Sequence, residues 1–434
     1  MKKGFSLVET IIAIGVLLII MVGVISVLQL SIKAAGRTGA RVGATSLVNK
    51  RMEMLRNLEY DNVGTVGGIP SGLILQEEIV NLNSIDYTLK TFIQYVDDPA
   101  DGLGDDDENG IATDYKRVRV EISWQGRYIA APVVAVSDFM PKGIESVTGG
   151  GTLSISVFDA QIQPVSLANI HIVNTDIVPN IDINVQTNPQ GKIVFPGSPS
   201  VGEYEITVTK EGYSTAQTYE ADSSNPNPDP GHLTILEGET TDASFAIDKL
   251  AISLVIETKT FQGLDLLYVE FDMIGNKIIG EDSGGQPIYK YSQNHDSGVT
   301  ARVSINNLEW DVYDMSSPMI NPNLYDIAAS DPPEPINVEP DTSNNLTLYL
   351  APHAPNTLLI TIKDPLITSA SVRLFKSGYD ETILSGFTGQ AFFTPLQTGI
   401  DYSLEVIKTG YQDYLLEDVE ILNQTEINII MTEP

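Results

Sequence analysis

Residues 2–10 read Lys2-Lys3-Gly4-Phe5-Ser6-Leu7-Val8-Glu9-Thr10, and an apolar run at residues 11–30 follows them directly. From residue 5 to residue 30 the only charged side chain is Glu9, and there is no proline. A helix rises about 1.5 Å per residue, so a segment of roughly 26 residues can cross a hydrocarbon core of about 30 Å. We predict one transmembrane helix, with the lysine end in the cytoplasm.

The residues around the apolar run differ from those of an ordinary secretory signal. A secretory signal has a short apolar core with a small-residue cleavage site after it, whereas here Gly4-Phe5 comes before the core. This order resembles the N-terminus of type IV prepilins and pseudopilins, over about the first 30 residues. The resemblance implies cleavage between Gly4 and Phe5 by a membrane-embedded prepilin peptidase, methylation of the new N-terminus and retention of the helix.

Glu9 supports the same interpretation, because it stands where this family keeps a glutamate. A carboxylate one turn inside a membrane helix is costly and is expected to have a partner. The resemblance implies that the partner is the α-amino group of Phe5 on a neighbouring subunit of a filament. The alternative is a plain membrane anchor whose Glu9 lies near the membrane surface.

The net charge and the cysteine content restrict the partners and the means of stabilisation that the remainder of the chain can have. The net charge is −32 over 434 residues, and within residues 1–60 only Glu9, Glu53 and Glu59 are acidic. The acidic remainder argues against nucleic acid or anionic lipid as its partner and suits a surface outside the cell. There is no cysteine, so stability comes from burial, with metal as a further contribution. Many type IV pilins carry a C-terminal cysteine pair, and this departure leaves the subtype open.

The helix is predicted to continue to residue 60, as a transmembrane and filament-core helix over residues 5–60 behind a leader at residues 1–4. Its second half repeats apolar residues at helical spacing, which predicts a face that packs on a sheet. These residues are Ala44, Leu47, Val48, Met52, Leu55 and Leu58. Three glycines, at positions 36, 39 and 43, predict a weakened stretch within it.

Alternating segments at 73–82, 85–96, 115–124 and 127–138 predict four strands. Asn83-Ser84 and Gln125-Gly126 fit the turns between them. A long helix packed on a small antiparallel sheet is similar to the α+β head of a pilin. We therefore assign residues 61–140 to such a head.

An acidic loop at residues 97–114 interrupts the predicted sheet. Asp105, Asp107 and Asn109, followed by glycine, match the opening D-x-D-x-N-G of a calcium loop. Lys116 stands where an EF-hand has its bidentate glutamate, and no helices flank the loop, so it is not an EF-hand. A calcium cage of another kind and a flexible acidic hairpin tip both remain open.

A glycine-rich linker at residues 141–152 precedes a region of strands and turns that extends to the C-terminus. The pattern G-x-x-x-F, followed by Y-x-[IL]-x-V-x-K-x-G-Y, occurs twice with the same spacing, from Gly191 and from Gly389. A looser version occurs around residues 298–313. We predict three tandem β-sandwiches, at residues 153–248, 249–352 and 353–434. The repeated pattern resembles carboxypeptidase-regulatory-like domains, which are transthyretin-like sandwiches, and implies core and corner positions for its tyrosines.

No pattern predicts an enzyme. The chain has four histidines, and none lies in a zinc-binding spacing such as H-E-x-x-H. His295, Asp296 and Ser297 offer the residue types of a catalytic triad, but neighbours in one loop do not reach the required geometry.

The sequence thus predicts a large minor pilin or pseudopilin of a type IV pilus or type II secretion-like filament. It would cross the cytoplasmic membrane once with its N-terminus inside, and then present its sandwiches on an extracellular filament for adhesion or spacing. The predicted partners are prepilin peptidase, other pilin subunits, the membrane and a surface ligand of unknown kind. The alternative is a membrane-anchored surface protein with ligand-binding β-domains that does not polymerise.

Overall fold

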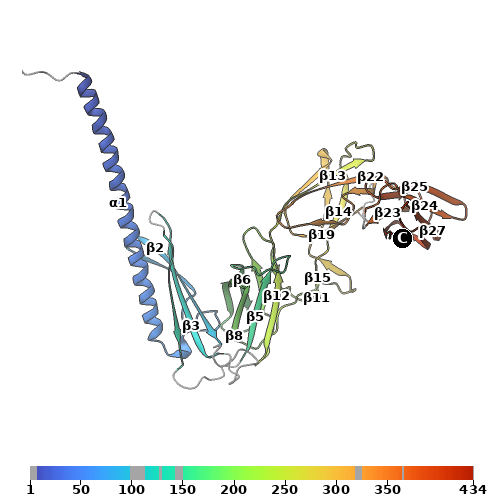
Figure 1. Ribbon diagram of the computed structural model, residues 1–434. Coiled ribbons are helices and arrows are strands. Elements are labelled where there is room, and N and C mark those ends of the chain that lie inside the picture. Colours follow the sequence, from blue (N-terminus) through green and yellow to red (C-terminus); the bar gives the residue numbers. More distant parts are fainter. Residues whose placement is uncertain are drawn as a thin grey trace, which may run out of the picture. The chain divides into compact units, whose positions relative to one another are not determined.

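The computed structural model describes residues 7–97, 113–126, 130–141, 150–317, 325–363 and 366–433. Over these residues one long helix is followed by a series of β-sheets, which confirms the predicted multidomain fold class (Figure 1). The chain divides into two compact units. The first comprises residues 1–156, 169–206 and 232–244, and the second comprises residues 157–168, 207–231 and 245–434.

Helix α1, Leu7–Arg56, is continuous over 50 residues, and is therefore about 75 Å long. A short 3-10 turn, Tyr60–Asn62, follows it. Within Ile14–Arg56 the helix contains a segment that is apolar and long enough to cross a membrane, and none of that segment is buried. By length and composition, α1 can therefore serve as a membrane segment.

The second half of α1 packs on the first sheet. Its buried side chains lie three or four residues apart, as an apolar face requires; they are Ala40, Ala44, Val48, Met52 and Leu55. The helix runs unbroken through the three glycines, so the stretch is not melted, and its lower stability stays a prediction. Gly43 also has a packing role: a Cβ there would lie 2.6 Å from the hydroxyl of Tyr87.

The first sheet has four antiparallel strands in the order β1-β2-β3-β4. They are β1 Glu77–Leu82, β2 Ile85–Val96, β3 Tyr115–Trp124 and β4 Val133–Phe139. Asn83 and Ser84 form the β1–β2 turn with positive φ of 54° and 59°, as a two-residue hairpin needs. The bounds predicted for the second and third strands are confirmed.

The outer two strands start later than the alternation predicts. Before β1, Ile74 hydrogen-bonds to Gly64 and Val66, so it belongs to the connection from α1. Before β4 stands Pro132, which has no N–H to offer a strand partner. The local apolar pattern does not distinguish these connecting segments from strands.

Two sheets form the first sandwich, with orders β12-β5-β8 and β10-β9-β6-β7. The first sheet contains β5 Gly151–Phe158, β8 Lys192–Ser198 and β12 Thr240–Ala246. The second contains β6 Asn169–Asn174, β7 Ile181–Gln186, β9 Glu205–Thr209 and β10 Ala216–Gln217. Strand β7 is an edge strand, and its side chains alternate between buried and exposed.

The middle and third sandwiches belong to the second unit. The middle one has the sheets β18-β13-β22-β20 and β17-β14-β19-β21, and the third has β26-β23-β29 and β25-β24-β27-β28. The middle strands are β13 Ala251–Thr260, β14 Glu270–Gly275, β17 Ser292–Asp296, β18 Arg302–Leu308, β19 Asp311–Ser316, β20 Tyr325–Asp331, β21 Ile336–Val338 and β22 Ser343–Pro352. The third sandwich contains β23 Thr357–Lys363, β24 Ser371–Lys376, β25 Tyr379–Leu384, β26 Gln390–Phe393, β27 Gly399–Ile407, β28 Tyr414–Ile421 and β29 Gln424–Ile430. In both, the first strand pairs in parallel with the last, β13 with β22 and β23 with β29.

The sequence repeat is also a structural repeat. Tyr204 and Tyr402 are buried, and each donates its hydroxyl hydrogen bond to the carbonyl oxygen five residues earlier, at 2.8 and 3.0 Å. Tyr313 of the middle sandwich makes the corresponding bond to Glu309 at 2.8 Å. These contacts have the form of the tyrosine corner of β-sandwiches. The core and corner role predicted for these tyrosines is confirmed.

A further small sheet lies within the second unit, next to the sheets of the middle sandwich in the chain. Strand β11, Asn227–Pro228, forms a three-stranded sheet with β15, Ile278–Glu281, and β16, Pro287–Tyr289. The side-chain amide of Asn225 donates to the carbonyl of Ile279 at 2.9 Å.

The joint between the middle and third sandwiches is made by buried polar side chains. Asp326 of β20 is 1% exposed and accepts hydrogen bonds from Ala354 N at 2.9 Å and from the side-chain amide of Gln424. Its carboxylate also contacts Nδ1 of His353 at 2.7 Å. Gln390 of β26 accepts a 2.8 Å bond from Ser330 N. Buried bonds of this kind hold two domains in one orientation.

Candidate functional site

The largest exposed apolar surface among the described residues belongs to the N-terminal half of α1. Its large apolar side chains are 49–79% exposed from Leu7 to Ile32, on every side of the helix. An apolar surface of this extent marks a contact with lipid or with other protein. The same helix is buried on one face from Ala40 to Leu55, so its two halves have different partners.

The predicted processing and assembly residues lie at the edge of the described chain. Gly4 and Phe5 are outside the described residues. The backbone of Glu9 lies in the first turns of α1. Its side chain is not among the described parts of the structure. Cleavage at Gly4-Phe5 and neutralisation of Glu9 remain predictions from the motif.

The predicted calcium residues Asp105, Asp107 and Asn109 also lie outside the described residues. The strands on either side of this loop are described, and there the backbone amide of Asp114 donates to the carbonyl of Val96 at 3.1 Å. Within the described ranges, no group of three or more His, Asp or Glu side chains is arranged to hold a metal ion. Calcium binding by residues 97–114 therefore remains a prediction.

Lys116, which occupies the position of the EF-hand glutamate, is a buried structural residue. It is 1% exposed, and its Nζ donates to the carbonyl of Tyr60 at 2.8 Å. The same atom lies 4.5 Å from the ring centroid of Tyr60 and 5.3 Å from that of Tyr95. Burial lowers the pKa of Lys116 to about 8.

The triad-like residues turn to separate partners. His295 and Asp296 end strand β17, where the sequence predicts a loop, and Ser297 follows that strand. His295 hydrogen-bonds to Tyr291 at 3.0 Å and stacks on its ring, and burial lowers the pKa of His295. Ser297 accepts a bond from Val269 N at 3.0 Å, and Asp296 accepts one from Gly298 N at 2.8 Å. Each of the three side chains therefore serves local structure, and the absence of enzymatic activity stays a prediction from the sequence.

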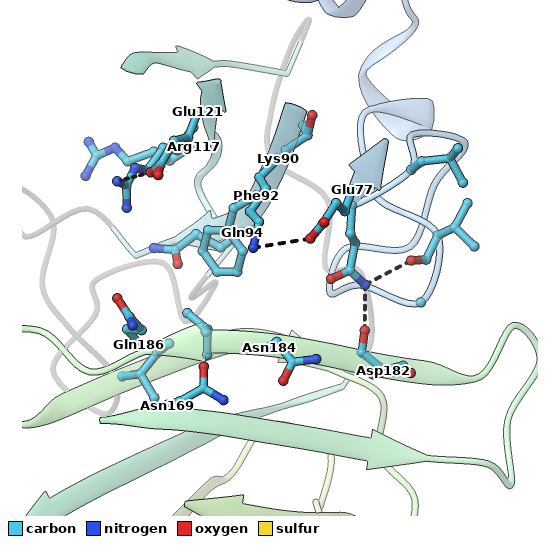
Figure 2. Close-up of a pocket in the computed structure, with 18 of the residues that line it drawn as sticks. Glu77, Lys90, Phe92, Gln94, Arg117, Glu121, Asn169, Asp182, Asn184 and Gln186 are labelled. Carbon is cyan, nitrogen blue, oxygen red and sulfur yellow. Dashed lines mark hydrogen bonds and ion pairs between the residues drawn. The ribbon is translucent and has the colours of Figure 1, made fainter. Parts of the chain in front are cut away.

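A groove of about 1240 Å³ lies within the first unit (Figure 2). One wall is the face of the first sheet that points away from α1, and the other is the outer face of β6 and β7. On β2 the odd-numbered residues Leu89 and Ile93 join the core under α1. Because side chains alternate along a strand, the even-numbered residues Phe92 and Gln94 point into the groove.

The second wall is rich in amide side chains. Asp182, Asn184 and Gln186 are the exposed residues of β7, and Asn169 of β6 pairs directly with Gln186. Figure 2 shows Asn169, Asn184 and Gln186 on the opposite side of the groove from Phe92 and Gln94. Polar groups thus face one another across a space that a β-sandwich would normally fill with apolar side chains.

The walls of the groove touch at its ends. The side-chain amide of Gln76 donates to the carbonyl of Asp182 at 2.6 Å, and the amide of Asp182 donates to the carbonyl of Gly67 at 2.8 Å. Phe92 packs edge-on against Phe195 of β8, with ring centroids 6.2 Å apart. These contacts fix the groove's width inside one compact unit.

Ion pairs neutralise much of the charge in the groove. Lys90 pairs with Glu77 at 3.2 Å, Arg117 with Asp138 at 2.7 Å, and Arg119 with Glu121 at 2.6 Å. A ligand that enters the groove therefore meets paired charges and amides instead of a strong single-sign field.

Sequence reasoning did not identify this groove. Its residues belong to seven strands, β1 to β4 and β6 to β8, and to the connections between them, and most of them look like ordinary solvent-facing positions. One signal was present: Asn180, Asp182, Asn184 and Gln186 place an amide or carboxylate at every second position. Such a run is unusual for a strand face exposed to bulk water, where charged and hydroxyl side chains are more typical.

Comparisons with known proteins give little beyond these observations. No protein-family model matches the chain, and no curated protein matches it. Among solved structures, the Bacillus anthracis TIE protein aligns over 82% of this chain and 73% of its own, at 14% identity and a TM-score of 0.20. The major pilin subunit of Bacillus cereus aligns over 66% of this chain and 100% of its own, at 10% identity and a TM-score of 0.18. A shaft pilin of Lactobacillus rhamnosus GG aligns over 48% and 100%, at 12% identity and a TM-score of 0.18. Likenesses this weak carry no argument about function.

Proposed function

We propose that the chain is a large minor pilin or pseudopilin that enters a type IV pilus or a type II secretion-like filament through α1. The observation that carries this proposal is the change of environment along one continuous helix. Residues up to Ile32 expose apolar side chains on all sides, whereas residues from Ala40 pack on a four-stranded sheet. Lipid covers the first half before assembly, and neighbouring helices cover it in a filament.

The assembly chemistry follows from the N-terminal motif. Prepilin peptidase cuts between Gly4 and Phe5, and the new N-terminus is methylated. The carboxylate of Glu9 then pairs with the α-amino group of Phe5 on a neighbouring subunit, which offsets the cost of a charge inside an apolar helix bundle.

The β-sandwiches serve as a stiff extension for adhesion or spacing outside the cell. Support comes from the joint between the middle and third sandwiches, where the buried Asp326 binds groups of both. Flexible linkers would let each sandwich reorient, but buried hydrogen bonds oppose such motion.

The decisive experiment examines the N-terminus and the location of the native protein. Mass spectrometry of the N-terminal peptide from membranes and from sheared filaments is expected to find a chain that begins at methylated Phe5, with part of it in the filament fraction. A chain that begins at Met1 and occurs only in membranes would instead establish the alternative, a single-pass surface protein that does not polymerise.

Two variants of the helix make this test specific. Glu9→Ala is expected to insert into the membrane normally and to be lost from sheared filaments. Glu53→Ala is the matched control, because Glu53 lies in the same helix and, among the described residues, its side chain pairs only with the exposed Arg56, at 2.7 Å. Normal assembly of Glu9→Ala would show that the role given to Glu9 is wrong.

A further inference from the structure

The groove of the first unit has the chemistry of a sugar-binding site. Gln94, Asn169, Asn184 and Gln186 line it, and within the described residues none of these four amides has a hydrogen-bond partner. Each amide offers a donor and an acceptor side by side. That arrangement matches neighbouring hydroxyl groups of a sugar ring, which also donate and accept.

One aromatic ring lies among the amides. Phe92 is held in place by its edge-on contact with Phe195, and Figure 2 shows it between Lys90 and Gln94 on the wall opposite Asn169 and Asn184. An aromatic ring provides an apolar surface for the C–H face of a sugar. Polar groups on one wall and an aromatic ring on the other suit a ligand that is itself polar at its edges and apolar on its faces.

The charges indicate that such a ligand is neutral. The cations Lys90, Arg117 and Arg119 are already paired with carboxylates. The protein as a whole carries a net charge of −32, which repels polyanions such as sulfated or uronic-acid glycans. Lys192 is the one lining cation without an ion pair among the described residues, so the groove offers an acidic polymer at most one unpaired positive charge.

The groove's size and the orientation of its strands favour a chain of sugars over a small molecule or a peptide. Its volume of about 1240 Å³ exceeds the usual range for drug-sized ligands, which reaches about 1000 Å³. A peptide that added to the edge of β7 would use backbone groups. The groove instead meets the side-chain faces of β2, β3, β6 and β7.

We propose that this groove binds a neutral oligosaccharide or a segment of a neutral polysaccharide, with Asn184 and Gln186 as hydrogen-bonding residues and Phe92 as the stacking residue. The site belongs to the first unit and does not depend on filament assembly, so it can be tested independently of the proposed pilin function.

The test uses the full chain in a zwitterionic detergent, because a detergent with a sugar head group would compete for the site. Maltohexaose, cellohexaose and chitohexaose are titrated by calorimetry, and a heparin hexasaccharide serves as the anionic probe. We expect at least one neutral probe to bind saturably to one site per chain, and the heparin fragment to bind more weakly. Binding of none of the neutral probes, or preferential binding of heparin, would overturn the proposal.

Variants then locate the binding. The double variant Asn184→Ala/Gln186→Ala is expected to weaken the neutral probe at least tenfold, and Phe92→Leu is expected to weaken it several-fold while keeping an apolar contact with Phe195. Gln293→Ala on β17 is the matched control, since it removes an exposed strand amide outside the groove. Circular dichroism confirms that each variant is folded. Unchanged sugar binding by the double variant, or binding of an unstructured peptide library in place of sugars, would refute the assignment.

Discussion

The hydroxyl of Tyr87 donates a 2.9 Å hydrogen bond to the backbone carbonyl of Ala40, in the core between α1 and the first sheet. Both residues are buried, at 1% and 2% exposure. The contact is possible because position 43, close to Ala40 on α1, is a glycine. A Cβ at Gly43 would lie 2.6 Å from the Tyr87 oxygen and 3.2 Å from its ring. One small residue in the helix thus determines how closely the sheet can approach.

Gly43→Ala is expected to destabilise the packing of α1 on the sheet by about 1–3 kcal/mol, since the added methyl group forces Tyr87 away from Ala40. Gly39→Ala, one turn earlier, is the matched control, because a Cβ there meets nothing within 4 Å. It is expected to be neutral or to stabilise the helix by up to about 1 kcal/mol. Urea unfolding followed by Trp124 fluorescence, in a Trp310→Phe background, measures both. Equal effects of the two substitutions would contradict the packing role of Gly43.

Lys116 is expected to make the stability of the first sheet and α1 rise with pH between about 8 and 10. Burial lowers its pKa to about 8, and an unfolded lysine titrates near 10.4. In this range the unfolded chain binds more protons than the folded chain, so the free energy of unfolding increases as pH rises. Below pH 8 both forms are protonated, and Lys116 adds no pH dependence.

The measurement compares urea unfolding at pH 7.5 and 9.5. The chain has two tryptophans, so a Trp310→Phe background leaves Trp124 as the single reporter of the first sheet. Lys116→Met should remove the rise with pH, whereas Lys90→Met, which removes a lysine with a 60% exposed side chain, should keep it. If the rise persists in Lys116→Met, the charge of Lys116 is not its cause.

These residues also indicate how far sequence reasoning extends. Strands β2 and β3 were predicted with their observed bounds, because one face of each is buried and the alternation is strong. The packing role of Gly43 was not predicted. Helix propensity is a local property, whereas Tyr87, the side chain that requires a glycine at position 43, lies on another element. The groove and the contacts of Asp326 were missed for the same reason. Both depend on contacts between polar side chains that are far apart in the sequence. The alternation of apolar and polar residues along a strand shows which face of the sheet a residue is on, but not which residues lie opposite it.

Tyr402→Phe is expected to destabilise the third sandwich by about 1–2 kcal/mol. Its hydroxyl donates to the carbonyl of Gln397 at 3.0 Å and accepts from the amide of the same residue at 3.2 Å, so its loss leaves backbone groups without partners. Hydrogen exchange of β27 should become faster. Tyr414→Phe is the matched control, because among the residues that the structure describes the hydroxyl of Tyr414 makes no such corner bond. Unchanged exchange in Tyr402→Phe would show that ring packing alone maintains the corner.

Asp326→Ala is expected to loosen the joint between the middle and third sandwiches, at a cost of about 3 kcal/mol. The substitution leaves the buried amide of Ala354 and the side chain of Gln424 without their acceptor. Asp326→Asn keeps one acceptor oxygen and should have a smaller effect. Asp413→Ala, an exposed position in the third sandwich, is the control for removal of a carboxylate.

Hydrogen exchange with mass spectrometry measures the amide protection of each peptide in the Asp326 variants. Faster exchange confined to the connection between β22 and β23 and to the start of β29 would support a joint that opens while both sandwiches remain folded. Equal loss of protection in β13 and β14 would mean that Asp326 maintains the core of the middle sandwich instead. Because the pilin proposal treats the sandwiches as a stiff extension, this local pattern decides whether that stiffness resides in the contacts of one buried carboxylate.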